Sequence, residues 1–330
     1  MENFMMLENN AIQVNSGVFA GIEAHLCYPS GELEGIRLSE KNMLVTYIGE
    51  LVPAYTETTR RKNKYSVQFH KNGMVKAVSL DEQQEIETPI GEFPAELVTF
   101  YNTGELYRFF PLDGKISGFW SEEEEKALCI PFSFDLGFAQ FVALLSGVVF
   151  YKSGAIKSIA LFPAEVISVT TKSGVLYSRQ GISLFESGEL ESLEPEEPTS
   201  IQTPIGKIIA YDTEAVGVNA DKNSLMFDVA GRVKQIITAY SRIAVQTQDG
   251  SLKMFRPSKT VHPLDDDAVF VKGMKIGFDY ESNTVTIVSD DSSGAFFIDK
   301  CGFHIEHIDS AQASCSPTDC AGCSLNCGTK

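Results

Sequence analysis

A short pattern that recurs at least five times constrains the fold of this chain most: a ring-bearing residue lies three residues before a glycine. A glycine at this place supplies the positive φ that a tight hairpin needs, and aromatic and branched neighbours favour extended strands. Each copy therefore predicts a strand, a turn and a second strand. The five copies are Tyr28–Gly31, His70–Gly73, Tyr101–Gly104, Tyr151–Gly154 and Phe185–Gly188.

Apolar residues surround each of these glycines at fixed distances. They are Cys27, Phe69, Phe100, Phe150 and Leu184 four residues before the glycine, Leu33, Val75, Leu106, Ile156 and Leu190 two residues after it, and Ile36, Val78, Phe109, Ile159 and Leu193 five residues after it. Because side chains on a strand alternate between two faces, the step from the second to the fifth position breaks the alternation. We therefore expect a β-bulge or bend after each turn. At about 1.5 to 3 kcal/mol for each buried side chain, the repeats would supply much of the core.

Two further features indicate internal repetition. A weaker sixth copy, Phe227–Gly231, keeps Val233 and Ile236 at the expected positions but lacks the second ring. Over a longer range, seven residues recur 115 positions later in one ungapped stretch, which predicts an internal duplication with equivalent Thr-Pro-Ile-Gly corners. The first set is Gly73, Ile86, Thr88, Pro89, Ile90, Gly91 and Ala95, and the second is Gly188, Ile201, Thr203, Pro204, Ile205, Gly206 and Ala210.

The hairpin units resemble the variant form of the MORN repeat, whose tandem aromatic-aromatic-x-x-Gly-x-aliphatic hairpins stack into an elongated antiparallel sheet. The resemblance covers the hairpins and not the whole chain. Here the five glycines lie 42, 31, 50 and 34 residues apart, whereas a regular MORN array has a shorter, constant period. This spacing favours hairpins embedded in two larger β lobes. The resemblance implies a scaffold or an interaction module.

These patterns predict an all-β, mainly antiparallel protein with two duplicated lobes of hairpin repeats and a cysteine-rich tail. We place the first lobe at residues 1–120 and the second at 145–260. An acidic connector with a possible short helix, 121–144, separates them. A C-terminal β segment, 261–310, precedes a metal-binding tail, 311–330.

Four charged segments lie outside the repeats. Ser121–Glu125 has the serine and third-position glutamate of a capping box and could open a short helix, with a solvated connector as the alternative. Glu194–Pro198 and Leu264–Asp267 combine charge with turn-forming residues and are expected to be exposed loops. Arg60–Lys64 is interpreted as a solvated hairpin loop, which would meet an acidic partner surface if it is functional.

Net charge narrows the class of partner. The chain carries 27 basic and 44 acidic residues, a formal net charge of −17, which disfavours nucleic-acid phosphate and anionic lipid as ligands. Met1–Asn10 lacks the basic start and apolar stretch of a secretory signal. The nearly apolar run Phe141–Tyr151 is far shorter than the roughly 20 residues that span a bilayer. We therefore expect a cytoplasmic protein with a protein partner, without nucleic-acid binding or membrane insertion.

Motifs for catalysis are missing from the sequence. It contains no phosphate-binding loop, dinucleotide fingerprint, nucleophile-elbow serine or His-Glu-x-x-His helix, so we assign no catalytic residue. His304 and His307 are three residues apart and would point to opposite faces of a strand, so a shared metal would need a turn there. Cys27 and Cys129 stand in apolar surroundings and are expected to be buried, unreactive thiols.

The C-terminal tail carries a compact set of metal-ligand residues, Cys315, Cys320, Cys323 and Cys327. Four thiolates complete the ligand set of a tetrahedral zinc ion or an iron-sulfur cluster, and the small residues between them let a loop wrap an ion. The first two spacings match the plant-type ferredoxin loop, but the fourth cysteine follows closely instead of lying far away. Zinc ribbons usually separate two Cys-x2-Cys pairs by a longer loop. We favour iron-sulfur over zinc, with a redox or copper role and a metal-free tail as alternatives.

The sequence thus predicts a non-catalytic accessory or interaction protein whose lobes dock a partner and whose tail holds a metal centre. One alternative is a redox metalloenzyme or electron-transfer protein that uses the tail cluster. Another is a pure repeat scaffold with a dispensable tail.

Overall fold

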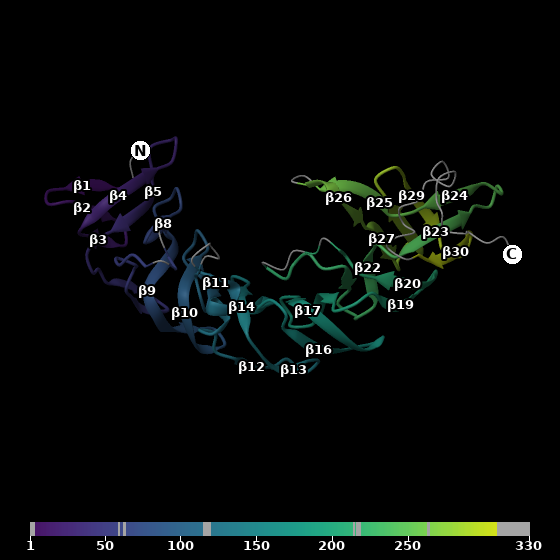
Figure 1. Ribbon diagram of the computed structural model, residues 1–330, viewed down its shortest axis with the longest axis horizontal. Coiled ribbons are helices and arrows are strands. Elements are labelled where there is room, and N and C mark those ends of the chain that lie inside the picture. The colour runs from purple at the N-terminus through teal and green to yellow at the C-terminus, as the bar shows by residue number, and fades with distance from the viewer. Residues whose placement is uncertain are drawn as a thin grey trace. The chain divides into compact units, whose positions relative to one another are not determined.

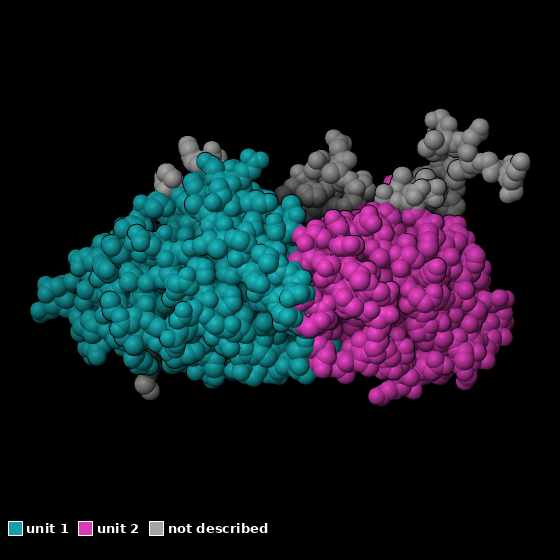
Figure 2. All heavy atoms as spheres, turned by 90° about the horizontal axis from the view of Figure 1, so that it is seen from below, with its two compact units in different colours: residues 1–136, 140–165, 184–188 teal, residues 137–139, 166–183, 189–330 magenta. Residues whose placement is uncertain are grey.

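The computed structural model describes residues 4–58, 60–61, 64–114, 120–213, 215, 219–262 and 265–308, with the backbone alone for 260–262 and 265–270. Within these residues the protein is nearly all β, with antiparallel sheets, which confirms the expected fold class. The chain divides into two compact units (Figure 2). Unit 1 comprises residues 1–136, 140–165 and 184–188, and unit 2 comprises 137–139, 166–183 and 189–330.

Unit 1 is built on one antiparallel sheet in the order β15-β14-β11-β10-β9-β8-β5-β4 (Figure 1). These strands are β4 (Ile22–Cys27), β5 (Leu33–Leu38), β8 (Val67–Phe69), β9 (Val75–Thr88), β10 (Gly91–Phe100), β11 (Leu106–Phe110), β14 (Leu145–Phe150) and β15 (Ile156–Leu161). Around it lie short hairpins formed by β1 (Met5–Leu7), β2 (Ala11–Val14) and β3 (Gly17–Phe19), by β6 (Leu44–Thr46) and β7 (Gly49–Leu51), and by β12 (Phe132–Asp135) and β13 (Gln140–Ala143). The helix α1 (Glu122–Lys126) belongs to this unit.

Unit 2 also contains an antiparallel sheet, in the order β29-β28-β27-β22-β21-β18-β17, in which β16 also pairs with β17. These strands are β16 (Val166–Thr171), β17 (Gly174–Leu184), β18 (Leu190–Pro195), β21 (Leu225–Phe227), β22 (Val233–Thr238), β27 (Met274–Asp279), β28 (Thr284–Val288) and β29 (Ser293–Phe297). Smaller sheets are formed by β19 (Thr199–Thr203) and β20 (Gly206–Ala210), by β23 (Ser241–Gln246), β24 (Leu252–Phe255) and β30 (Gly302–His307), and by β25 (Ser258–His262) and β26 (Asp265–Lys272).

The repeat glycines form the turns that the sequence predicts. All five have positive φ, and so does the glycine of the sixth copy: Gly31 (99°), Gly73 (82°), Gly104 (106°), Gly154 (89°), Gly188 (99°) and Gly231 (70°). In a representative turn, the N–H of Gly104 donates to the carbonyl of Tyr101 at 3.0 Å, and the N–H of Tyr101 donates to the carbonyl of Glu105 at 2.8 Å. Both the turn assignment and the sixth repeat are confirmed.

A bulge follows the turn, as the spacing predicts. Thr99 pairs with Arg108 and Phe100 pairs with Leu106, so Tyr107 is the extra residue. The same shift occurs where Cys27 pairs with Leu33, Phe69 with Val75, Phe150 with Ile156 and Phe227 with Val233. The residue five positions after each glycine is fully buried: Ile36, Val78, Phe109, Ile159, Leu193 and Ile236. The repeats therefore do supply a large part of the core.

In four of the five copies, the ring before the turn bonds to the backbone of the next hairpin. The hydroxyl of Tyr28 donates to the carbonyl of Phe69 at 2.8 Å, that of Tyr101 to Phe150 at 2.8 Å, and that of Tyr151 to Leu184 at 2.9 Å. His70 takes the same place, with Nε2 at 3.0 Å from the carbonyl of Phe100. The lysine that follows the ring of one copy can lie over the ring of an earlier copy. Lys71 lies over Tyr28 in this way, and Lys152 lies over Tyr101. We call this series the ring ladder.

The duplicated Thr-Pro-Ile-Gly corners have the same local geometry. The hydroxyl of Thr88 donates to the carbonyl of Gly91 at 2.6 Å, and that of Thr203 donates to the carbonyl of Gly206 at 2.6 Å. The strands that lead into them differ, because β9 is continuous while the equivalent stretch splits into β18 and β19. Pro195 and Pro198 flank this break and have no N–H to offer a sheet.

Two expectations for the charged segments can be compared with the structure directly. Ser121 caps α1 with a complete capping box, in which its hydroxyl accepts the N–H of Glu124 and the carboxylate of Glu124 accepts the N–H of Ser121. The expectation of an exposed loop is wrong for Asp265–Asp267, which lies in β26. Strand pairing with β25 accounts for this, because Asp265 is opposite His262.

The glycine requirement can be tested without a steric complication at Gly31. A Cβ there would meet no atom within 4 Å, so a substitution acts through its φ of 99° alone. Gly31→Val should lower the free energy of unfolding by more than 1 kcal/mol, since a branched residue is strained at such φ. The control is Gly277→Val, because Gly277 also has open space but lacks positive φ. Equal effects of the two variants in urea denaturation would contradict the backbone explanation.

Candidate functional site

The predicted metal ligands Cys315, Cys320, Cys323 and Cys327 lie outside the described residues. Among the residues that are described, no group of three or more His, Cys, Asp or Glu side chains is arranged to hold a metal ion. His304 and His307 both lie in β30, where they pair with Ala244 and Ser241, so the turn that a shared metal would need is not formed there.

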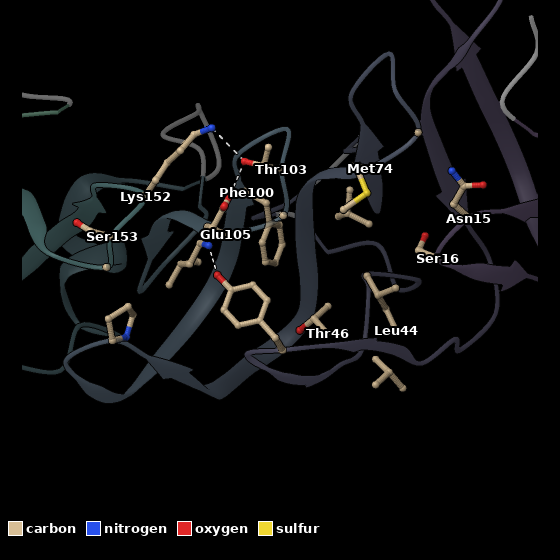
Figure 3. A pocket seen from close by; sticks show the side chains of 18 of the residues that line it. Asn15, Ser16, Leu44, Thr46, Met74, Phe100, Thr103, Glu105, Lys152 and Ser153 are labelled. Carbon is tan, nitrogen blue, oxygen red and sulfur yellow. Dashed lines mark hydrogen bonds between the residues drawn. The ribbon is translucent and has the colours of Figure 1, made fainter.

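Unit 1 contains a groove of about 630 Å³ along the turn ends of its hairpins (Figure 3). Its lining is mostly apolar, and three successive repeat turns contribute their glycines to it. The lining residues are Asn15 and Ser16 from the β2–β3 turn, Leu44–Tyr47 from the β6–β7 hairpin, Gly73–Val75, Thr103–Leu106 and Tyr151–Gly154 from the repeat turns, and Pro89 and Phe100. A mostly apolar concavity of this size with a few polar groups is typical of ligand sites.

Tyr47 supplies a directed polar group in this groove. Its ring lies edge-on to Phe100, with centroids 6.4 Å apart, and its oxygen accepts the N–H of Leu106. Partial burial, assisted by the negative charge of Glu105, raises the pKa of Tyr47 to about 12. The phenol therefore stays protonated at neutral pH, and its hydrogen can be donated to a ligand.

At one end of the groove, the positive charge of Lys152 and the negative charge of Glu105 compensate each other. Lys152 Nζ donates to the hydroxyl of Thr103 at 3.0 Å, and that hydroxyl donates in turn to Glu105 (Figure 3). The hydrogen bond from Thr103 is the main cause that holds the pKa of Glu105 below its usual value, and Lys152 adds to it. Among the described lining residues these are the charged side chains, so the groove has no net charge.

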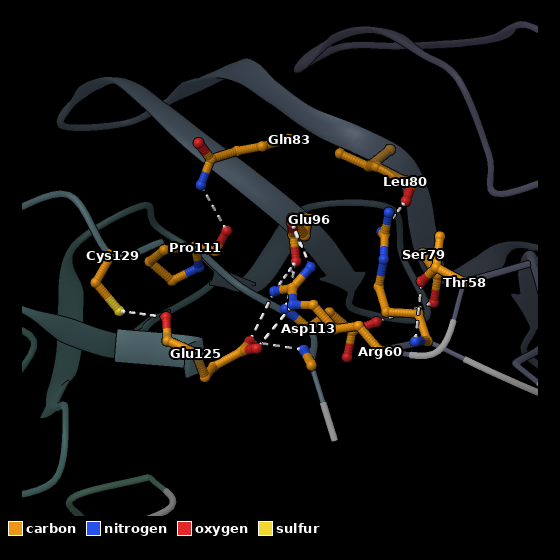
Figure 4. A network of polar contacts seen from close by, with 12 residues as sticks. Thr58, Arg60, Ser79, Leu80, Gln83, Glu96, Pro111, Asp113, Glu125 and Cys129 are labelled. Atoms are coloured by element: carbon orange, nitrogen blue, oxygen red, sulfur yellow. Dashed lines mark hydrogen bonds and ion pairs between the residues drawn. The ribbon is translucent and has the colours of Figure 1, made fainter. Parts of the chain in front are cut away.

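A second polar feature of unit 1 is a buried ionic network centred on Arg60 (Figure 4). The guanidinium binds Glu96 of β10 through two nitrogens, at 2.8 and 2.7 Å, and binds both oxygens of Glu125 of α1 at 2.7 Å. Glu125 also accepts Trp120 Nε1 at 2.6 Å and the N–H of Gly114 at 3.0 Å. Burial raises the pKa of Glu125, but the bonds from Arg60 and Trp120 outweigh it and hold that pKa below its usual value.

This network corrects the interpretation of Arg60–Lys64 as a solvated loop. Arg60 is 9% exposed, Arg61 donates to the backbone carbonyls of Leu80 and Asp81, and Lys64 lies 2.5 Å from a carboxylate oxygen of Asp113. Lys62 and Asn63 lie outside the described residues. The acidic surface expected of a partner is supplied by this chain itself.

Glu194 corrects a second expectation, that Glu194–Pro198 forms an exposed loop. Its carboxylate is fully buried, and accepts the N–H of Ser224 at 2.7 Å and that of Asp212 at 3.1 Å. Arg179 lies 3.5 Å away. Burial raises the pKa of Glu194 despite these partners. Glu196, Glu197 and Pro198 are exposed, as expected.

The thiols outside the tail are less buried than expected. Cys27 and Cys129 are half-buried, as is Cys301. Cys129 nevertheless stays protonated at neutral pH, because burial and the nearby Glu125 raise its pKa to about 11.

Comparison of the chain with protein-family models, with curated proteins and with solved structures finds no match. Within the described part of the chain, no helix has the length and apolar character needed to cross a membrane. The resemblance of the hairpins to MORN repeats stays a prediction.

The ionic network gives a prediction for stability and its pH dependence. Glu125→Gln should lower the free energy of unfolding at pH 7 by about 2 kcal/mol, because a charge-assisted bond to Arg60 is weakened. Since the folded-state pKa of Glu125 is lowered, its contribution is present above the unfolded pKa of about 4.3 and is lost as pH falls through the folded value. The difference between the proteins should therefore shrink below about pH 4.

The matched control is Glu123→Gln, on the exposed face of the same helix. It should change the free energy of unfolding by less than about 0.5 kcal/mol at either pH. A Glu125→Gln variant as stable as this control would refute the role assigned to the network.

Proposed function

We propose that this chain is a non-catalytic interaction protein, located in the cytoplasm, that docks a protein partner through the groove of unit 1. The observation that carries the proposal is the groove itself: an apolar concavity with an uncharged hydrogen-bond donor, Tyr47, and a compensated charge pair, Lys152 and Glu105. Such a lining favours tight packing and orientation of a ligand over acid-base chemistry. The ionised groups of the Arg60 network are bound to one another, which suits a structural role.

The second part of the proposal concerns the tail. Cys315, Cys320, Cys323 and Cys327 hold one metal centre, with iron-sulfur favoured over zinc because the ligand spacing is closer to a ferredoxin loop than to a zinc ribbon. The tail has little apolar material to fold around, so metal binding would be what orders it. The centre either anchors the docked partner or passes electrons to it.

The docking proposal can be tested with a matched pair of valines. Val45, on β6, lines the groove and is 73% exposed. Val142, on β13, is 68% exposed and does not line the groove. Val45→Asp should reduce partner recovery in affinity capture at least about fivefold, since an aspartate would be desolvated in the complex. Val142→Asp should leave recovery unchanged. The measurement is quantitative mass spectrometry of proteins captured by each full-length variant.

If both aspartate variants retain a partner equally, that partner docks outside the groove. Turnover of a small molecule by purified protein, with no captured partner that responds to Val45→Asp, would favour an enzyme.

The metal proposal has its own test. Protein prepared anaerobically should be brown, with broad visible absorption and stoichiometric iron and sulfide. Replacing Cys320 and Cys323 together by serine should remove the colour while the thermal unfolding of the β units stays unchanged, because each unit contains its own core. Colourless, metal-free protein would contradict the proposal, and stoichiometric zinc would contradict its iron-sulfur part.

A further inference from the structure

The length of the groove points to an extended ligand. It is lined by Gly73, Gly104 and Gly154, the turn glycines of three successive hairpins in the sheet order β8-β9-β10-β11-β14-β15. Neighbouring strands in a sheet are roughly 4.8 Å apart, so four spacings set the first and last of these turns roughly 19 Å apart. An extended peptide advances about 3.3 Å per residue and would cover this distance with about six residues.

The polar groups of the groove suit a peptide backbone better than a charged ligand. The Tyr47 oxygen is occupied by the N–H of Leu106, which leaves its hydroxyl hydrogen for one acceptor, and an extended peptide offers a carbonyl at every residue. Lys152 and Glu105 compensate each other, so a charged side chain in the middle of the groove would gain no counter-charge. The side chains that enter the groove should therefore be apolar and uncharged.

Two acidic residues come close to the β6–β7 side of the groove. Glu50 is directly opposite the groove residue Val45 in the β6–β7 pairing, so both side chains lie on one face of the hairpin. The N–H of Glu87 donates to the carbonyl of Ile48, next to Tyr47. Both carboxylates are exposed, in a chain of net charge −17. Residues that flank the bound segment should therefore be basic.

Resting on the docking function proposed above, we propose that the occupant of this groove is an extended segment of the partner, about six residues long. Its apolar, uncharged centre lies in the groove, one of its backbone carbonyls accepts the hydroxyl of Tyr47, and lysine or arginine residues flank it beside Glu50 and Glu87.

The experiment is a selection from a phage-displayed library of random 12-residue peptides on the immobilised full-length chain. The enriched peptides should share an apolar centre of about six residues with basic flanks. The Kd of a fluorescein-labelled consensus peptide, measured by fluorescence anisotropy, should rise more than tenfold with Val45→Asp and stay within twofold of wild type with Val142→Asp.

Two further variants test the individual contacts. Tyr47→Phe removes the donor and should weaken consensus-peptide binding about fivefold, while the same change at exposed Tyr177, which does not line the groove, should have no effect. Glu50→Lys together with Glu87→Lys should weaken binding at low salt and reduce its salt dependence.

Three outcomes would overturn this inference. They are enrichment of acidic or centrally charged peptides, binding that Val45→Asp leaves unchanged, and native mass spectrometry that finds a small apolar molecule in the groove. A captured protein that depends on Val45, combined with no peptide enrichment, would leave the docking function standing and refute the extended-segment ligand alone. Folding of each variant is checked by its thermal unfolding.

Discussion

The bond from a repeat ring to a carbonyl of the next hairpin, made by Tyr28, His70, Tyr101 and Tyr151, is the interaction on which the arrangement of unit 1 depends. A β-bulge leaves one residue unpaired and weakens the register between strands. The ring ladder acts at this point: Tyr28 and Tyr101 bond the carbonyls of Phe69 and Phe150, the residues at which the register shifts. Each bond adds about 1 kcal/mol net, but together they fix how successive hairpins sit beside one another. The row of turns that lines the groove is a consequence.

The sequence predicts the hairpins well because their determinants are local. In the third copy, Gly104 and the apolar residues Leu106 and Phe109 are enough to indicate the turn, the bulge and the buried face. Where another residue replaces the glycine, the same reasoning fails: Asn283 has a φ of 52° at the β27–β28 turn and carries no such signal. The clue in the sequence is Tyr280, a ring-bearing residue three positions before Asn283. Its hydroxyl donates to the carbonyl of Val233.

The groove and the buried charges could not be read from the sequence, because their parts come from distant segments. Arg60 and Glu125 are 65 residues apart, and the local sequence around each is typical of an exposed charged residue. Lys64 and Arg179 are also 115 positions apart, and each lies beside a carboxylate whose pKa burial raises, half-buried Asp113 and fully buried Glu194. The carboxylates themselves, Asp113 and Glu194, do not occupy equivalent positions.

The fold and the proposed docking function place different demands on the residues that line the groove. Positions 104 and 154 need glycine for their positive φ, and a Cβ there would also come close to other lining residues, Met74 at 3.2 Å and Pro89 at 3.0 Å. Changing them would alter the turn and the width of the groove together. Val45, Tyr47 and Lys152 carry no such backbone constraint, and their side chains supply apolar contact, a hydrogen-bond donor and charge. In the proposed docking function, selectivity can therefore vary through these three residues while the hairpin framework stays unchanged.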